Sequence, residues 1–195
     1  LGTQPAASVG LSLTVGDTSE GSLDKTTLIF STTNWSTPQT VTVTGLDDGI
    51  DDGDVTYAIS PTVVSTDAVY ASLGAPAVSV TNEDDDEVGI TVSATTILET
   101  TEYGGAVSFT VVLDCQPAAT VTIPLASSDE GEGTVSAVNL SFGTSDWNVP
   151  QTVTVKGVND TDDDDDVPYT VLIGPAASSD PAYDGLDTPD VIVVN

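Results

Sequence analysis

Short segments in which hydrophobic and polar residues alternate run through most of the chain. In the first half these segments cover residues 9–13, 28–30, 41–43, 55–59 and 78–80. Alternation with a period of two is typical of β-strands that bury one face. Gly, Pro, Asp and Ser residues separate the segments, and none of them shows a strong helical period. The pattern predicts an all-β fold.

The second half of the chain repeats the first. QTVTVTGLDDGIDDGDVTY at residues 39–57 returns as QTVTVKGVNDTDDDDDVPY at residues 151–169, an offset of 112 residues (151 − 39). A period of this length indicates a duplicated domain rather than a solenoid turn. Other matching pairs are Trp35 and Trp147, Glu20 and Glu132, and, after one inserted residue, Asn82 and Asn195.

The second copy contains a stretch that the first copy lacks. Residues 88–112 carry further alternating segments with no counterpart earlier in the chain. About seven short strands in this copy, separated by turn residues, are typical of an immunoglobulin-like β-sandwich. We therefore expect two tandem immunoglobulin-like β-sandwich domains, the first without its opening strands. The expected boundaries are 1–82 and 88–195, with an acidic linker at 83–87.

A first domain without these strands would expose a sheet edge and part of its core. Two sources of the missing strands stay open: residues that precede this segment in the native polypeptide, or strands from a neighbouring molecule. Preceding residues are the simpler explanation.

The charge of the chain excludes several classes of partner. It has 31 acidic residues against two lysines, with no Arg and no His, and a formal net charge of -29. Nucleic acid and anionic membranes are not expected as partners, because binding to phosphates requires basic side chains. Divalent cations are the natural partner, and calcium is the hard cation that prefers oxygen ligands.

Acidic residues gather in three places in the first repeat: a hairpin loop, the run after the last strand, and the turn after the first strand. Turns of a sandwich can meet at one end, and calcium takes six to eight oxygen ligands. The candidate ligands there are Asp17, Asp47, Asp48, Asp51, Asp52, Asp54, Asp84, Asp85 and Asp86. Those of the second repeat are Glu102, Asp129, Asp160, Asp162, Asp163, Asp164 and Asp166.

The acidic residues allow two other interpretations, of which the sequence excludes one. An EF-hand loop is excluded, because Asp165 stands at the glycine position and Val171 at the position of the bidentate glutamate. A solvated acidic hairpin that only keeps the surface soluble stays open. The recurrence of acids at both hairpins, with so few cationic side chains, favours a bound cation.

The segments PQTVTVTGLDDGIDDGDVTYAI and VSVTNEDDDEVGITV resemble the Calx-β domains of sodium–calcium exchangers and bacterial surface proteins. The resemblance implies that the hairpin acids at 47–54 and the trailing acids at 84–86 bind calcium together. It implies corresponding early-strand and turn ligands at Glu102 and Asp129. The second hairpin departs from the pattern, because Asn159 replaces the first aspartate.

No constellation of residues predicts an enzyme. The chain lacks His, a nucleophile–base pair and a phosphate-binding glycine loop, and only 5% of its residues are aromatic. We expect a calcium-binding structural repeat of a secreted or cell-surface protein, such as an adhesin stalk or extracellular fibre. Its expected partners are neighbouring repeats or other copies in a fibre, and glycans. A regulatory calcium sensor and a carbohydrate-binding module are the alternatives.

Overall fold

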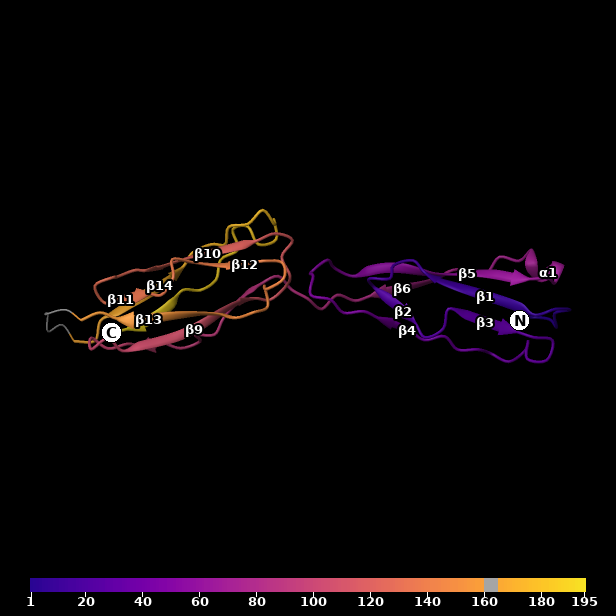
Figure 1. The fold of residues 1–195 in the computed structure, drawn as a ribbon, viewed down its shortest axis with the longest axis horizontal. Helices are drawn as coiled ribbons and strands as arrows, with labels where there is room; N and C mark the ends of the chain where they lie inside the picture. The colour runs from indigo at the N-terminus through magenta and orange to yellow at the C-terminus, as the bar shows by residue number, and fades with distance from the viewer. Residues whose placement is uncertain (160–164) are drawn as a thin grey trace. The chain divides into compact units, whose positions relative to one another are not determined.

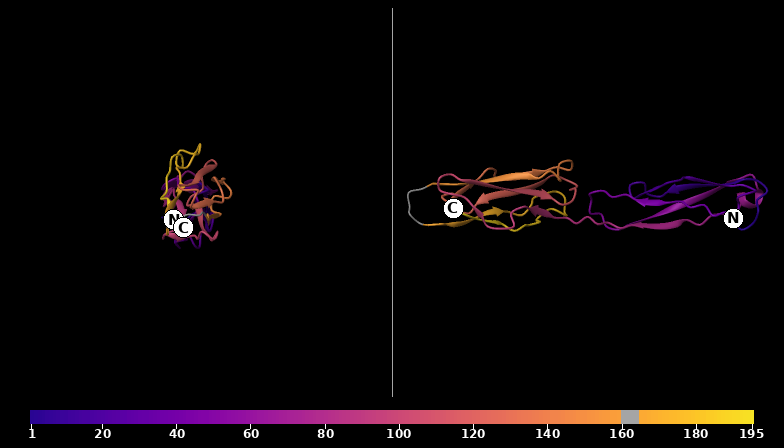
Figure 2. Two further views of the ribbon diagram at one scale, coloured as in Figure 1. Left: turned by 90° about the vertical axis from the view of Figure 1, so that its left-hand side faces the viewer. Right: turned by 90° about the horizontal axis from the view of Figure 1, so that it is seen from below.

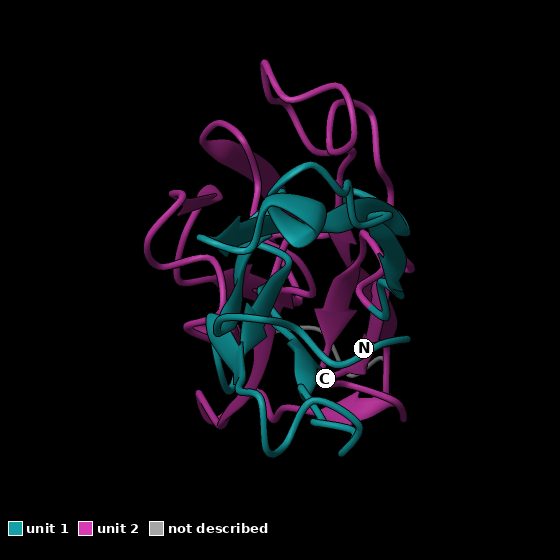
Figure 3. Ribbon diagram, turned by 90° about the vertical axis from the view of Figure 1, so that its right-hand side faces the viewer, with its two compact units in different colours: residues 1–48, 52–85 teal, residues 49–51, 86–195 magenta. Residues whose placement is uncertain are grey.

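The computed structural model describes residues 1–159 and 165–195. Contacts between residues divide the chain into two compact units, which Figure 3 shows in separate colours. The first unit comprises Leu1–Asp48 and Asp52–Asp85, and the second comprises Gly49–Asp51 and Asp86–Asn195.

The first unit contains a four-stranded antiparallel sheet, in the order β3-β1-β5-β6, and a two-stranded sheet of β2 and β4 (Figure 1). A one-turn helix, α1, follows β5. Asp67 caps this helix by accepting hydrogen bonds from the N–H groups of Val69 and Tyr70. The elements are β1 (Val9–Val15), β2 (Gly21–Leu23), β3 (Thr27–Phe30), β4 (Val43–Gly45), β5 (Val55–Ser65), α1 (Ala68–Ala71) and β6 (Val78–Asn82).

The second unit contains two sheets, in the orders β12-β10-β14-β15-β8 and β11-β13-β9-β7. Its strands run along the length of the unit in the views of Figures 1 and 2. One pairing is parallel, between β15 and β8. The strands are β7 (Ile90–Val92), β8 (Leu98–Glu99), β9 (Ala106–Leu113), β10 (Val121–Ser127), β11 (Gly133–Val135), β12 (Asn139–Phe142), β13 (Gln151–Gly157), β14 (Pro168–Ile173) and β15 (Val191–Val194).

The hydrophobic core is concentrated in the second unit. Inward-facing residues of both sheets form one cluster there, including Val111 and Val153 of one sheet and Ile123, Val171 and Val193 of the other, all fully buried. Among the described residues, 18 buried hydrophobic side chains belong to the second unit and 6 to the first. The first unit covers its inward-facing side chains less completely because it has fewer strands.

The prediction of an all-β fold with two immunoglobulin-like sandwiches is confirmed. The predicted strands of the first repeat recur as β1, β3, β4, β5 and β6. The sequence pattern did not predict the three-residue strands β2 and β11. Each contains a single hydrophobic side chain, Leu23 or Val135, so no alternation is visible. None of the described helices is long or apolar enough to cross a bilayer.

Candidate functional site

The base of the first acidic loop is held by one asparagine. Asn82, the last residue of β6, donates from Nδ2 to the carbonyl oxygen of Leu46 at 2.7 Å and to Oε2 of Glu20 at 3.2 Å. The backbone N–H of Leu46 donates to the carbonyl oxygen of Glu20 at 3.0 Å. Leu46 directly precedes the aspartates of the loop, so these bonds fix where the loop begins.

The second unit builds the same support with the equivalent residues. Asn195 donates from Nδ2 to the carbonyl oxygen of Val158 at 3.0 Å and to Oε2 of Glu132 at 3.4 Å. Val158 donates its N–H to the carbonyl oxygen of Glu132 at 2.9 Å. We call Glu20 with Asn82, and Glu132 with Asn195, the loop clamps. The recurrence of all four residues was visible in the sequence, but nothing there indicated that the asparagines hold the loops.

A close backbone approach accompanies each clamp. A Cβ atom on Gly45 would lie 2.4 Å from Oδ1 of Asn82, and one on Gly157 would lie 2.4 Å from Oδ1 of Asn195. At Gly157 the Cβ atom would also lie 2.4 Å from the backbone carbonyl oxygen of Thr101, so glycine is required there. A side chain at Gly45 would displace the amide of Asn82.

The hairpin loop and the acidic run after β6 meet in the first unit. Oδ2 of Asp84 accepts hydrogen bonds from the N–H groups of Asp52 at 3.1 Å and Gly53 at 2.7 Å. Oδ1 of Asp54 accepts one from the N–H of Asp84 at 3.0 Å. Gly53 has a φ of 75°, a left-handed conformation that glycine adopts without strain. Two of the three predicted acidic groups are thus joined by reciprocal bonds.

The remaining candidates of the first unit have different surroundings. Asp47, Asp48 and Asp85 are exposed. Asp17 is half-buried, and its carboxylate accepts bonds from the hydroxyl and the N–H of Ser19. These bonds, the hydroxyl first, lower the pKa of Asp17 below its ordinary value and keep it ionised.

Two candidates belong to the second unit by their contacts. Oδ2 of Asp51 accepts a hydrogen bond from the N–H of Val88 at 3.2 Å. Oδ1 of Asp86 lies 4.0 Å from Sγ of Cys115, a buried free cysteine. Burial, followed by the negative charge of Asp86, raises the pKa of this thiol.

The second acidic loop is described only in part. Asp160, Asp162, Asp163 and Asp164 lie outside the described residues. Asp166 is exposed, and Oδ1 of Asp129 accepts a bond from the N–H of Gly131 at 2.9 Å.

Glu102 lies at the base of this second loop. It lines a surface hollow together with Lys156, Val158 and Asn159. The early-strand candidate is therefore close to the segment that leads into the loop.

The chemistry of the acidic residues fits a hard cation, but those that the structure describes do not gather their side chains around a common point. All candidate ligands are carboxylates, the oxygen donors that calcium prefers. Within the described residues, no group of three or more Asp, Glu, Cys or His side chains is arranged to hold a metal ion. Oδ2 of Asp84 and Oδ1 of Asp54 instead accept backbone N–H bonds. The backbone thus brings the acidic segments together without forming a coordination shell.

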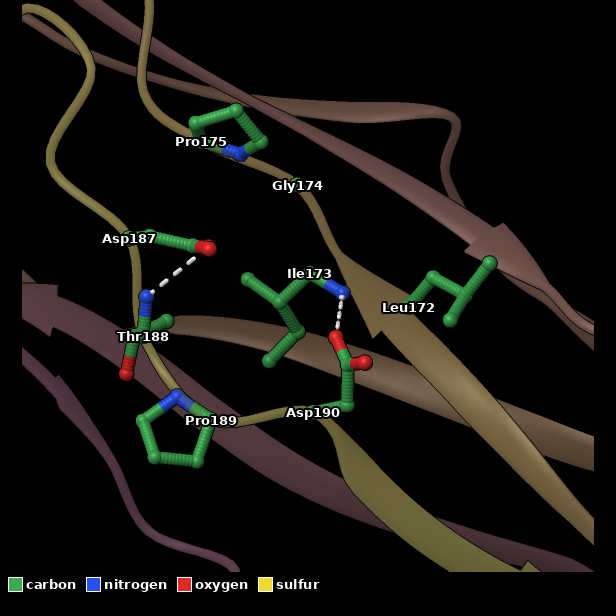
Figure 4. A pocket seen from close by; sticks show the side chains of 8 residues that line it. All are labelled: Leu172, Ile173, Gly174, Pro175, Asp187, Thr188, Pro189 and Asp190. Carbon is green, nitrogen blue, oxygen red and sulfur yellow. Dashed lines mark hydrogen bonds between the residues drawn. The ribbon is translucent and has the colours of Figure 1, made fainter.

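The second unit has another surface hollow lined by carboxylates (Figure 4). It lies between the end of β14 and the segment before β15. Its two carboxylates accept backbone bonds: Oδ1 of Asp190 from Ile173 N at 2.7 Å, and Oδ1 of Asp187 from Thr188 N at 3.1 Å. These aspartates hold the chain in place, and the hollow presents no nucleophile with an adjacent base.

The chain is similar to several solved structures. No protein-family model matches the chain, and no curated protein matches it. The crystal structure of the calcium binding domain CBD12 of CALX1.1 has 18% identity and a TM-score of 0.44, covering 89% of this chain and 70% of that chain. CBD12 from CALX1.2 has 17% identity and a TM-score of 0.42, covering 92% and 72%. WR4, a C. elegans MSP family member, has 15% identity and a TM-score of 0.32, covering 54% and 94%.

Proposed function

We propose that the chain is a non-catalytic, calcium-binding pair of β-sandwich repeats of the Calx-β type. The observation that supports this most is the junction of the hairpin loop with the trailing acidic run through Asp84. Two segments of like charge, distant in sequence, are held side by side at this point. Such an arrangement is unfavourable unless the charge is offset, and the chain has only two lysines to offset it.

In the first repeat, the proposed ligands are the exposed carboxylates of Asp47, Asp48 and Asp52, with Asp84 and Asp85 from the trailing run. The loop clamp fixes the start of the loop, and the bonds of Asp84 fix its end. An ion bound between these fixed points would be coordinated by these carboxylates. Calcium, when bound, would neutralise the carboxylates and link the two segments.

The proposed role of the metal is structural. The trailing run is also the sequence that joins the two repeats, so an ion held there would restrict its backbone. We propose that the repeats belong to a secreted or cell-surface protein, such as a stalk or fibre, and that neighbouring repeats are their partners. Calcium at a hundred times its dissociation constant would stabilise the folded state by about 2.7 kcal/mol.

Calorimetric titration with calcium in low-salt buffer tests this proposal. We expect uptake by the wild type and at least about tenfold weaker binding when Asp47→Asn and Asp48→Asn are combined, because two charged ligands are lost. Asp187→Asn is the matched control: it removes a carboxylate outside both loops and should bind like the wild type. Absence of calcium uptake by the wild type would overturn the proposal.

A further inference from the structure

One buried polar group of the first unit has no partner. Tyr57, on β5, is 6% exposed, and its hydroxyl makes no hydrogen bond in the part of the chain that the structure describes. Buried hydroxyls are normally satisfied, because leaving one unpaired is destabilising. The unpaired hydroxyl therefore points to a missing group.

The second unit supplies that group from a strand that the first unit lacks. Tyr169 is the equivalent of Tyr57, and its hydroxyl lies 3.3 Å from Oγ1 of Thr100. The same Oγ1 donates to Oδ1 of Asn195 at 3.0 Å, and so ties the tyrosine to the loop clamp. Thr100 directly follows β8, which pairs in parallel with β15.

The strand that corresponds to β15 is uncovered in the first unit. There, β6 is the last strand of its sheet, whereas β15 lies between β14 and β8. Val78 of β6 is 58% exposed, and its equivalent Val191 is 3% exposed. Both repeats have a valine at this position, but only the second unit has the additional strand and buries the valine.

The other sheet of the first unit also lacks a strand that its equivalent in the second unit has. In the second unit, β13 pairs with both β11 and β9, whereas β4, its equivalent, pairs with β2 alone among residues 1–85. Val155 of β13 is fully buried, and the equivalent Val43 of β4 is half-buried. In each sheet of the first unit, the edge strand is thus the equivalent of a strand that, in the second unit, pairs with an opening strand.

We propose that the first unit is an acceptor for opening strands of the same sequence type as residues 90–112. One strand would lie beside β6 and bring a threonine hydroxyl to Tyr57, and the others would extend the sheet beyond β4. The inference does not depend on calcium. It rests on the second unit, in which strands of this type fill the equivalent places.

The geometry also indicates where the occupant enters. The N–H of Leu113, the last residue of β9, donates to the carbonyl oxygen of Trp147 at 3.3 Å. The amino group of Leu1 donates to the carbonyl oxygen of Trp35 at 2.8 Å. Leu1 and Leu113 thus hold equivalent positions, and an added strand that corresponds to β9 would end at Leu1.

Hydrogen exchange on the whole chain tests this inference. One variant carries the sequence of residues 88–112 ahead of Leu1, and its matched control carries a shuffled sequence of the same composition. We expect the backbone amides of β6 to exchange at least about tenfold more slowly with the true extension. Equal exchange in the two variants would overturn the proposal.

A double-mutant cycle tests the hydroxyl contact itself. In the extended chain, Tyr57→Phe and a Thr→Val change at the extension's copy of Thr100 should be coupled, with the effects on melting temperature less than additive. Tyr169→Phe with Thr100→Val gives the reference coupling in the second unit. Tyr57→Phe should change the melting temperature of the unextended chain little, because the hydroxyl there has no partner.

Two further outcomes would contradict the inference. Strict additivity in the extended chain would show that the tyrosine does not meet the added strand. Slower exchange with a separate 88–112 peptide, but not with the joined extension, would show that entry at Leu1 is wrong.

Discussion

Asn82 is the last residue of β6, and Asn195 directly follows β15. Each holds the segment that leads into an acidic loop. Both donate from Nδ2 to a loop carbonyl and to a glutamate. The surroundings of the two asparagines differ. Asn195 is 9% exposed and accepts a hydrogen bond from the hydroxyl of Thr100, whereas Asn82 is half-buried. The same side chain is therefore expected to contribute more in the second repeat.

Replacing these asparagines with alanine tests that difference. Asn82→Ala should lower the free energy of unfolding by about 0.5–1.5 kcal/mol. Asn195→Ala should lower it more, because Asn195 is more buried and also accepts a hydrogen bond from the buried Thr100. Asn139→Ala, an exposed asparagine at the start of β12, is the control. Urea unfolding measures all three. Equal effects of all three changes would contradict a clamping role.

Tyr183 makes stability depend on pH at the alkaline end. Its hydroxyl donates to the carbonyl oxygen of Cys115 at 2.7 Å and accepts from the N–H of Cys115 at 3.1 Å. The side chain is 1% exposed, and burial raises its pKa to about 12. An unfolded tyrosine ionises near pH 10, so the unfolded state loses this proton first as the pH rises.

The contribution of Tyr183 to the free energy of unfolding should therefore be full below about pH 10 and be lost between about pH 10 and 12. Tyr183→Phe should be less stable at neutral pH and show a shallower fall. The fall should not vanish, because burial also raises the pKa values of Tyr169 and Cys115. Urea unfolding at several pH values measures this, and an unchanged slope in Tyr183→Phe would contradict the assignment.

At the scale of elements, equivalent strands of the two repeats differ in how well they are covered. Val191→Ala, on the covered strand β15, should cost about 1.5–3 kcal/mol of unfolding free energy, since a buried valine loses its contacts. Val78→Ala, at the matching position of β6, should change it by less than about 0.5 kcal/mol, because that side chain is exposed. Denaturant unfolding of both variants tests this, and equal costs would mean that β6 is covered in solution.

Sequence patterns predicted strands where one face is buried. In β5 the alternation of Thr56, Tyr57, Ala58 and Ile59 matches the observed burial of Tyr57 and Ile59. The helix α1 was not predicted, because it is a single turn set by the cap at Asp67 rather than by a hydrophobic period. The loop clamps were not predicted either, since their partners are 62 and 63 residues apart in sequence and only the fold brings them together.

For the candidate site, the sequence predicted which segments meet but not how their carboxylates are oriented. That the loop at 47–54 and the run at 84–86 can meet at one end of the sandwich was an expectation from the sequence. The hydrogen bonds that join Asp84 to Asp52, Gly53 and Asp54 agree with it. How the carboxylates would orient did not follow, because each one can bond either to a backbone N–H or to an ion. The ligand assignment therefore stays a prediction.

At the scale of the whole molecule, a formal net charge of -29 opposes compaction. If calcium offsets this charge at the loops, EDTA should lower the melting temperature and excess calcium should raise it, beyond the effect of matched sodium chloride. Scanning calorimetry with both additions measures this. An identical response to sodium chloride and calcium would mean that screening alone is at work.

The most direct test of a calcium site in the first repeat is a titration of the ¹⁵N-labelled chain followed by NMR. The account predicts saturable shifts of the amides of residues 47–54 and 84–86, at concentrations where magnesium causes little change. Unmoved resonances, or small shifts spread evenly over all exposed aspartates, would contradict it.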